Sequence, residues 1–286
     1  MRKLLLLALF SAACAHTTTT PPFERPEHAN DAPSAVVSTT GGATEPCVPG
    51  NALLNAALWV QHAAEYDAAA LQTYAAARRA LDAALAQKSA RDAKPPAIVL
   101  DLDETALDNT AFEARAIGAG KTYDADLWKT WVAEADAKAV PGAAEFLAYA
   151  KSRGVTPFYV TNRDHPQETD STRRNLERLG FPVSDGTVLM RGARPEWKSD
   201  KSSRRDFVAS THRVLLLLGD DLNDFADARD KSAADRDAIV QQARDAWGTR
   251  WFIVPNPMYG SWERAITGSG GTPCEQFQKK LEALHP

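Results

Sequence analysis

The chain has 286 residues, of which 44% are hydrophobic, enough to bury the core of one α/β domain with a helical appendage but hardly of two large domains. Its 33 lysines and arginines are balanced by 37 aspartates and glutamates, giving a net charge of -4 with no long basic run. A nucleic-acid polymer is therefore not an expected partner, whereas a small anionic ligand held by local positive charge is compatible with the sequence.

The amino terminus has the pattern of an export signal. A short basic segment precedes the apolar run 4–13, which is far shorter than the roughly 20 residues that span a bilayer. Cys14 follows small residues and resembles a lipoprotein processing site, although Ser11 stands where such signals usually carry leucine. Plain cleavage at this small-x-small segment is the alternative. Residues 1–14 are thus predicted to direct the protein to the cell envelope, lipid-anchored to the outer membrane, or otherwise to the periplasm or the exterior.

The next segments predict a tether and then helices. Residues 15–46 are rich in Thr, Pro, Ala, Ser and Gly and poor in large apolar side chains, which is typical of a flexible linker. Residues 53–85 lack Gly and Pro and carry leucines at near-helical spacings, which predicts one long helix or a helical pair.

Export changes what is expected of the two remaining cysteines, Cys47 and Cys274. Disulfides persist in oxidising compartments, and these residues flank the region expected to fold. They can therefore form a bridge between its two ends, with two unpaired thiols as the alternative.

From residue 97 onward, apolar strands alternate with amphipathic helices, which predicts a doubly wound parallel sheet covered on both faces. The predicted strands are 97–101, 156–161, 187–190, 213–218 and 250–254, and the predicted helices between them are 141–153 and 167–179. About 55 residues separate the first two strands, too many for a plain crossover. Residues 50–90 and parts of 106–140 are therefore expected to form a small helical subdomain beside the sheet.

Two carboxylates, Asp101 and Asp103, stand where the first predicted strand ends. The carboxyl ends of parallel strands are where α/β proteins bind ligands, so both side chains can reach one crevice. Two close carboxylates repel each other, and a hard cation such as Mg²⁺, which takes oxygen ligands, would offset that repulsion. For an isolated Asp-x-Asp, an acidic surface turn is the alternative.

Later strand ends carry complementary groups. Segment 161–163, Thr-Asn-Arg, can donate hydrogen bonds to an oxyanion or can simply cap the second strand. The acidic segment 219–224 follows a strand of aliphatic residues, so its clustered carboxylates need a cation to offset their repulsion. The spacing of these carboxylates does not fit an EF-hand calcium loop. The basic segment 198–205 lies between these two segments and, taken alone, would be a solvated face.

Taken in order, Asp-x-Asp-x-Thr, a strand-end Thr, a Lys and Gly-Asp-Asp-x-x-Asp resemble the haloacid dehalogenase superfamily of phosphatases. Within that superfamily, the class C acid phosphatases, bacterial lipoproteins with 5'-nucleotidase activity, are similar in segments 58–66, 101–105, 161–163, 219–224 and 255–260. The resemblance covers roughly residues 50–280 and implies a Rossmann-like phosphatase domain over residues 47–286.

The resemblance implies a role for each motif residue. Asp101 would attack phosphorus to form an aspartyl-phosphate, which divides one slow displacement into two faster ones. Asp103 would protonate the leaving oxygen and later take a proton from water. A free aspartate has a pKa of about 3.9, so this requires a raised pKa or an acidic medium.

One divalent cation, Mg²⁺, is the implied cofactor. Asp101, the main-chain carbonyl of Asp103 and Asp220 would hold it, while Asp221 and Asp224 would orient its waters from an outer shell.

The phosphoryl oxygens would be held by Thr161, Asn162 and a lysine. Lys201 is the expected lysine because basic residues follow it shortly, as in the family, and Lys198 is the alternative.

The expected function is an exported, metal-dependent acid phosphatase that hydrolyses nucleoside 5'-monophosphates and aryl phosphates. Tyr123 and Tyr259 lie where the family stacks a nucleobase, a contact worth about 1–3 kcal/mol. A non-catalytic surface module that binds or stores nucleotides is the alternative, and a sugar phosphomutase is a further one. No segment of the sequence specifies an oligomeric state.

Overall fold

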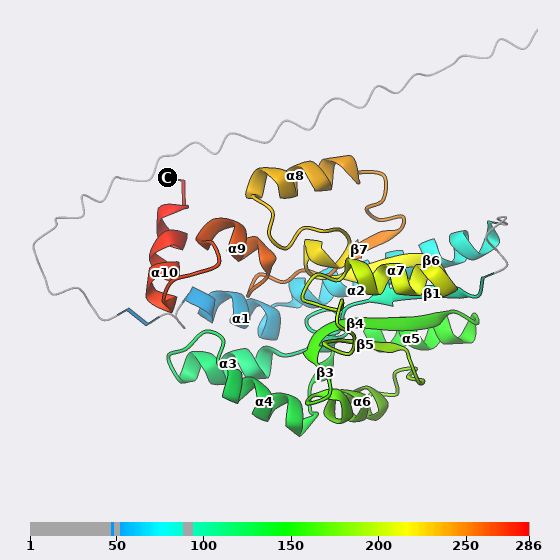
Figure 1. The fold of residues 1–286 in the computed structure, drawn as a ribbon, viewed down its shortest axis with the longest axis horizontal. Helices are drawn as coiled ribbons and strands as arrows, with labels where there is room; N and C mark the ends of the chain where they lie inside the picture. The colour runs from blue at the N-terminus through cyan, green and yellow to red at the C-terminus, as the bar shows by residue number, and fades with distance from the viewer. Residues whose placement is uncertain (1–46, 49–51, 88–93, 286) are drawn as a thin grey trace, which may run out of the picture. The chain divides into compact units, whose positions relative to one another are not determined.

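The computed structural model describes residues 47–48, 52–87 and 94–285 (Figure 1). The predicted export signal, its Cys14 and the whole of the predicted tether lie outside the described residues. No helix in the described ranges is long and apolar enough to cross a lipid bilayer.

Five parallel strands form the central sheet in the order β5-β4-β1-β6-β7. They are β1 (Pro96–Leu100), β4 (Thr156–Asp164), β5 (Val188–Arg191), β6 (Arg213–Gly219) and β7 (Trp251–Ile253). The chain adds strands first on one side of β1 and then on the other, which confirms the predicted doubly wound α/β fold. The carboxyl ends of β1, β4 and β6 consequently meet at one edge of the sheet.

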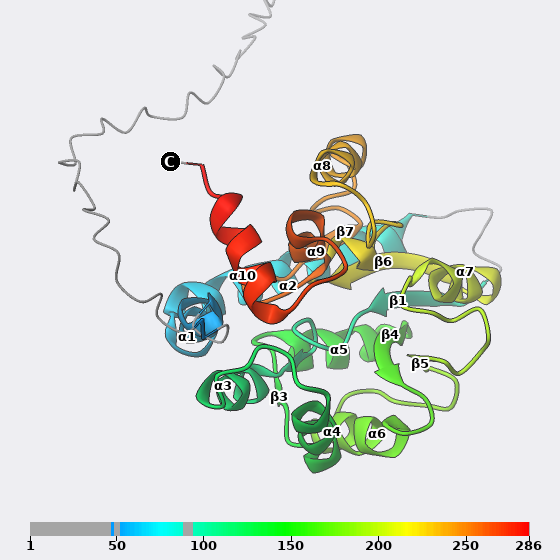
Figure 2. The same ribbon diagram turned by 60° about the vertical axis from the view of Figure 1, so that its left-hand side comes forward.

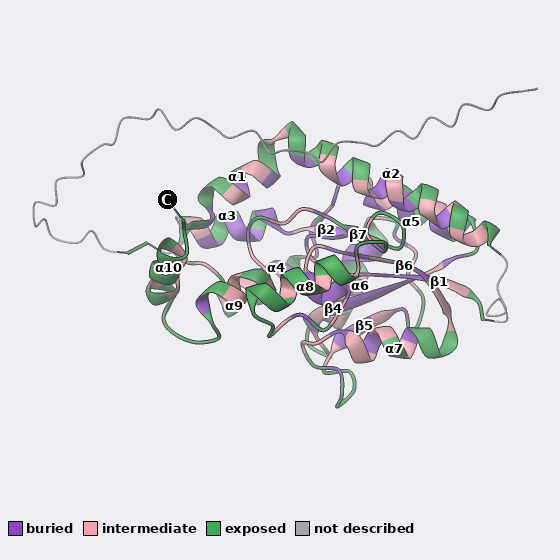
Figure 3. Cartoon of the chain, turned by 90° about the horizontal axis from the view of Figure 1, so that it is seen from above, coloured by how far each residue is buried: buried purple, intermediate pink, exposed green. Residues whose placement is uncertain are grey.

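Helices cover both faces of this sheet. The described helices are α1 (Leu54–His62), α2 (Ala64–Ala86), α3 (Thr110–Gly118), α4 (Ala125–Glu134), α5 (Ala143–Ser152), α6 (Thr169–Arg178), α7 (Ser202–Thr211), the 3₁₀ helix η2 (Leu222–Asp224), α8 (Ala233–Gln242), α9 (Ser261–Thr267) and α10 (Pro273–Glu282). Figure 3 shows α2 and α5 on one side of the sheet and α7 on the other. The main core fills the first interface, with Ile98 and Leu100 of β1 completely buried in it, and a smaller core around Val99 fills the second.

Of the two arrangements expected for the early helical segment, the structure has the helical pair, because the backbone at Ala63 is extended between α1 and α2. Two element boundaries differ from the sequence-based expectation. Helix α5 begins at Ala143 rather than Pro141, since Gly142 takes a left-handed φ of 87° that ends the preceding turn. Strand β4 continues to Asp164, so segment 161–163 belongs to the strand and is not its cap.

The long insertion after β1 adds two helices and a small sheet. It contains α3, α4 and a two-stranded antiparallel sheet of β2 (Leu107–Asp108) and β3 (Lys138–Ala139). Helices α3, α4 and α9 gather beyond the carboxyl ends of the strands (Figure 2). A disulfide joins Cys47 and Cys274, whose Cα atoms are 6.0 Å apart, and so ties the residues before α1 to α10.

Candidate active site

A buried lysine joins two aspartates at the carboxyl edge of the sheet. Asp101 directly follows β1, and its Oδ1 lies 2.7 Å from the amide nitrogen of Leu102 and 2.7 Å from Lys201 Nζ. Lys201, at the start of α7, also donates to Asp224 Oδ1 at 2.6 Å. Among the described residues nothing donates a hydrogen bond to Asp101 Oδ2, so this oxygen remains available for chemistry.

Asp220, directly after β6, completes a cluster of three carboxylates. Oxygen atoms of Asp101, Asp220 and Asp224 lie within 4.8 Å of one another. Thr105 Oγ1 donates to Asp220 Oδ1 at 2.9 Å, and Asn256 Nδ2 donates to Asp220 Oδ2 at 2.9 Å. Neutral donors from two separate loops therefore orient both oxygens of Asp220.

Burial and like charge perturb these groups. Burial raises the pKa of Asp101, and the nearby carboxylates raise it further against the opposing charge of Lys201. Burial also raises the pKa of Asp220, with the charges of Asp224 and Asp101 adding to the effect. For Lys201, burial lowers the pKa, but the two adjacent carboxylates more than offset it and hold the pKa above its usual value. Lys201 is therefore a permanent cation in the physiological pH range.

The donor set fits a hard divalent cation. Three carboxylates face one ammonium group, which leaves an excess of negative charge at this edge, and carboxylate oxygens are ligands that Mg²⁺ prefers. Asp224 already uses Oδ1 on Lys201, and its Oδ2 accepts from the amides of Asp220 at 3.2 Å and Asp221 at 3.0 Å. Asp224 is therefore committed to a cationic partner, whereas the donors to Asp220 are neutral and Asp101 Oδ2 accepts from no described residue, so Asp101 and Asp220 are the side chains best placed to hold a cation directly.

Asp103 has a separate set of partners. Its Oδ1 accepts from Arg163 at 2.8 Å and from Asn109 Nδ2 at 2.9 Å, and Thr161 Oγ1 lies 3.4 Å from its Oδ2. The side chain of Arg163 is only 1% exposed. The sequence predicted that Arg163 either donates to an oxyanion or is exposed at the end of a strand. In the structure Arg163 is buried against Asp103 instead.

Asn162 and Arg204 form a hydrogen-bonded framework that joins the end of β4 to the loop before α7. Asn162 Nδ2 donates to the carbonyl of Ser199 at 3.1 Å, and Asn162 Oδ1 accepts from Arg204 at 2.7 Å. The fully buried Arg204 also donates to the carbonyl of Thr161 at 2.5 Å and to that of Lys198 at 2.7 Å. Both polar atoms of the Asn162 side chain therefore have partners within the protein, and one Nδ2 hydrogen remains for the phosphate contact that the resemblance implies. The side chain of Lys198 is exposed, whereas Lys201 reaches Asp101.

Asp221 also supports the fold locally. It accepts from Ser261 Oγ at 2.5 Å, from the Ser261 amide and from the Asn223 amide at 2.8 Å, so it caps η2 and fixes the start of α9. It lies outside the carboxylate cluster found among the described residues. Gly219 is needed at the end of β6 because a Cβ there would overlap the carboxyl group of Asp224.

An aromatic group stands beside Arg163. Tyr123 is 65% exposed, and its ring centroid is 6.4 Å from that of Trp128 and 6.1 Å from that of Phe112. The Arg163 guanidinium carbon lies 5.5 Å from the centroid of Trp128. Tyr123 and Trp128 thus offer apolar rings next to the Asp103 side of the site.

Tyr259 lies on the other loop that borders the site. Its hydroxyl donates to the buried carboxyl group of Glu104, and its ring packs against a small apolar cluster formed by α1 residues, Tyr66 and Met258. Tyr259 is therefore anchored to the turn that carries Asp103, while part of its surface stays accessible.

Sequence reasoning missed four residues that the structure brings to the site: Asn109, Trp128, Arg163 as an Asp103 partner, and Arg204. Asn109 lies in the same motif as Asp103, six residues further on, so its proximity could have been noticed. Arg204 stands in the basic segment 198–205, but nothing in that pattern separates a fully buried arginine from a solvated one.

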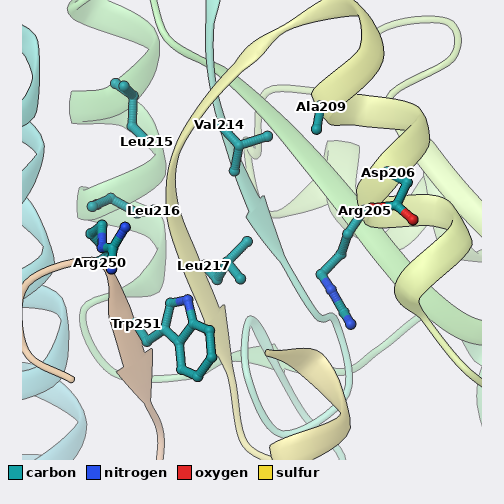
Figure 4. Close-up of a pocket in the computed structure, with 9 residues that line it drawn as sticks. All are labelled: Arg205, Asp206, Ala209, Val214, Leu215, Leu216, Leu217, Arg250 and Trp251. Atoms are coloured by element: carbon teal, nitrogen blue, oxygen red, sulfur yellow. The ribbon is translucent and has the colours of Figure 1, made fainter. Parts of the chain in front are cut away.

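Two cavities lie away from the cluster of carboxylates. One of about 240 Å³ runs along β6 between α7 and β7, lined by Leu217, Trp251 and Arg205 among others (Figure 4). The other, of about 640 Å³, lies between α4 and α6 and includes Asp164 and Glu168. None of the three clustered carboxylates of the described chain lines either cavity. The polar groups at the strand ends, rather than these cavities, are suited to catalysis.

A doubly wound parallel sheet with paired aspartates, a threonine, a lysine and further aspartates at its strand ends defines a phosphatase of the haloacid dehalogenase type. The model of the HAD superfamily, subfamily IIIB (acid phosphatase), matches residues 43–262, and the chain belongs to this family. It is therefore a hydrolase acting on small phosphomonoesters, as the resemblance predicted.

Solved structures agree with this assignment. The chain is similar to the class C acid phosphatase from Bacillus anthracis, with 37% identity over 84% of this chain and 99% of that one and a TM-score of 0.78. A second structure of that enzyme, with tungstate bound, matches over the same shares with 37% identity and a TM-score of 0.77.

Proposed function

We propose that this phosphatase is exported, depends on a divalent cation, most simply Mg²⁺, and hydrolyses nucleoside 5'-monophosphates and aryl phosphates. The observation that carries the proposal is the different setting of two neighbouring aspartates. Asp101 is held at one oxygen by Lys201 and a main-chain amide, while Asp103 is held by Arg163 and Asn109. Such a division suits one nucleophile and one proton-transfer group.

Asp101 Oδ2 attacks phosphorus and forms an aspartyl-phosphate, while Lys201 balances charge on the phosphoryl oxygens. Thr161 Oγ1, close to Asp103 Oδ2, is placed to donate to the same group. A cation held by Asp101, the main-chain carbonyl of Asp103 and Asp220 would supply electrostatic stabilisation of the phosphoryl charge. Asp221 and Asp224 would act indirectly, by fixing the loop and Lys201.

Asp103 donates a proton to the leaving oxygen and then takes one from the water that hydrolyses the aspartyl-phosphate. In the first step the ester P–O bond breaks as the bond from Asp101 to phosphorus forms. In the second step water cleaves the bond from Asp101 to phosphorus, which releases inorganic phosphate and restores the Asp101 carboxylate. The oxyanion tungstate bound to the similar B. anthracis enzyme supports a site for a tetrahedral anion.

Nucleotide substrates are proposed from the rings beside the site. Tyr259, Tyr123 and Trp128 can contact a base, and stacking is worth about 1–3 kcal/mol per base. Because Tyr123 is 65% exposed, Tyr123→Ala should raise KM for nucleoside monophosphates by roughly tenfold and leave KM for p-nitrophenyl phosphate nearly unchanged.

Export is proposed from the amino-terminal sequence, with Cys14 as the acylation site, and the Cys47–Cys274 disulfide supports an oxidising compartment. Residues 15–46 would then tether the phosphatase domain, residues 47–286, to the outer membrane. Mass spectrometry of the mature amino terminus distinguishes a diacylglyceryl cysteine from a plain cut.

A phosphate-release panel of nucleoside monophosphates, sugar phosphates and aryl phosphates, run with and without EDTA, tests the proposal. Asp101→Asn, Asp103→Asn and Asp220→Asn should each lose activity, whereas Asp230→Asn, at a surface ion pair with Arg264, should not. Turnover that survives chelation, or that survives all three substitutions, would refute it.

A further inference from the structure

We propose that Arg163 is the positioning residue for proton transfer by Asp103: it fixes one carboxyl oxygen and leaves the other to serve the leaving group. This inference rests on the proposed role of Asp103 and adds a residue to it.

The two oxygens of Asp103 have unequal environments. Oδ1 accepts from Arg163 Nη2 at 2.8 Å and from Asn109 Nδ2 at 2.9 Å. The single Nε hydrogen of Arg163 is shared between the two oxygens, at 3.1 Å to Oδ1 and 3.3 Å to Oδ2, and Thr161 Oγ1 lies 3.4 Å from Oδ2. Two short donors of its own occupy both lone pairs of Oδ1, so Oδ2 is the oxygen that exchanges protons with the substrate.

Arg163 is itself immobilised. Its remaining terminal nitrogen donates to Thr172 Oγ1 of α6 at 3.2 Å, and the ring of Trp128 covers the guanidinium. Only 1% of its side chain is exposed, against 17% for Asp103, so the pair is covered on the arginine side and open on the aspartate side. A rigid planar fork of this kind fixes a carboxylate in both position and rotation.

The second donor to Oδ1 is equally fixed. Trp131 Nε1 donates to Asn109 Oδ1 at 2.8 Å, which orients the amide so that its Nδ2 faces Asp103. The Asn109 main-chain amide is held by Glu104 Oε1 at 2.9 Å. Donors from the turn after β1 and from β4 therefore converge on one oxygen.

The backbone explains why Arg163 points inward. Thr161 and Arg163, two positions apart in β4, both contact Asp103, whereas Asn162 between them contacts Arg204 of α7. The alternation of side chains along β4 therefore continues to the strand end, even though its pairing with β5 is interrupted between Thr161 and Asp164. This alternation directs the guanidinium to Asp103, 60 residues away in the chain.

This role predicts a dependence on the leaving group. Alkoxide leaving groups need a proton as the ester bond breaks, whereas 2,4-dinitrophenolate leaves without one, and general acid catalysis contributes about 10²–10⁴-fold. The parameter to compare is kcat/KM, because it reports the step that cleaves the ester and is independent of the later hydrolysis of the aspartyl-phosphate.

The test uses Arg163→Met assayed on an alkyl phosphate, phenyl phosphate and 2,4-dinitrophenyl phosphate. We expect kcat/KM to fall by about 10²-fold or more on the alkyl ester and by less than about tenfold on the dinitrophenyl ester. Arg204→Met is the matched control, since Arg204 is equally buried beside the site but binds carbonyls of the framework. Its loss should be the same on all three esters.

A double-mutant cycle separates positioning from general damage. In an Asp103→Asn background, Arg163→Met should change kcat/KM on phenyl phosphate by less than about threefold, because the group it positions is already gone. If Arg163→Met fails to fold, Asn109→Ala replaces it, with a smaller loss of the same leaving-group pattern.

Two failures are distinguishable. If Asp103→Asn itself shows no leaving-group dependence, the proton-transfer role of Asp103 is wrong. If Asp103→Asn shows it but Arg163→Met and Asn109→Ala lose activity equally on all esters, or the loss persists in full without Asp103, Arg163 is not a positioning residue.

Discussion

Replacing Lys201 with methionine tests the electrostatic design of the site. The substitution removes the ammonium group that lies 2.7 Å from Asp101 and 2.6 Å from Asp224 and leaves three clustered carboxylates without a cationic side chain among them. Removing one partner of a buried ion pair costs about 3–5 kcal/mol. At 2–4 °C per kcal/mol for a domain of this size, Tm in EDTA should fall by roughly 6–20 °C. Loss of a charge that stabilises the transition state should lower kcat by roughly 10²–10³-fold.

A second variant separates stability from catalysis. Lys201→Met combined with Asp224→Asn removes one charge of each sign, so much of the lost Tm should return while kcat stays low. Differential scanning calorimetry in EDTA and steady-state turnover of p-nitrophenyl phosphate measure the two effects. The reasoning is refuted if Lys201→Met keeps more than about a tenth of the wild-type kcat, or if the double variant is as unstable as the single one.

Three further predictions concern metal, pH and the disulfide. At 100 times its Kd, Mg²⁺ should increase the free energy of unfolding by about 2.7 kcal/mol and so raise Tm. Asp220→Asn should abolish that rise, and an equal rise in the variant would contradict the assigned ligand. Burial raises the pKa of Glu113 to about 7 from an ordinary value of about 4.5, and the charge of Glu263 adds to this effect. The folded state therefore binds the proton more tightly than the unfolded state, and the free energy of unfolding falls as the pH rises from about 4.5 to about 7. Glu113→Gln should remove this slope and gain up to about 3 kcal/mol at neutral pH in urea unfolding, with the exposed Glu65→Gln as control; an unchanged slope would show that Glu113 is not responsible. Because Cys47 and Cys274 are 227 residues apart, reduction should cost about 2–5 kcal/mol of stability with little change in kcat; a proportional loss of activity in the folded, reduced protein would link the disulfide to the site instead.

Much of the sheet was predictable because its strands are short apolar runs bounded by polar segments. The five predicted strands match β1, β4, β5, β6 and β7 to within a few residues. The predicted boundaries were wrong where backbone geometry decides them. The left-handed conformation of Gly142 makes α5 begin at Ala143, and the pairing of Asp164 with Arg191 extends β4 past Thr161.

The order of motifs along the chain determined the family and the fold, because alternating strands and helices permit few arrangements and bring the carboxyl ends of β1, β4 and β6 to one edge. The sequence by itself also indicated which residue types stand at that edge. It could not determine the partner of each side chain. The ion pair between Arg163 and Asp103 and the ties from Arg204 join residues 60 and 43 positions apart, and they depend on strand register and on burial. Only the tertiary structure decided that Arg163 holds Asp103 while Asn162 contacts Arg204 and Ser199, because strand alternation fixes the opposite directions of the two side chains but not the partner that each one meets.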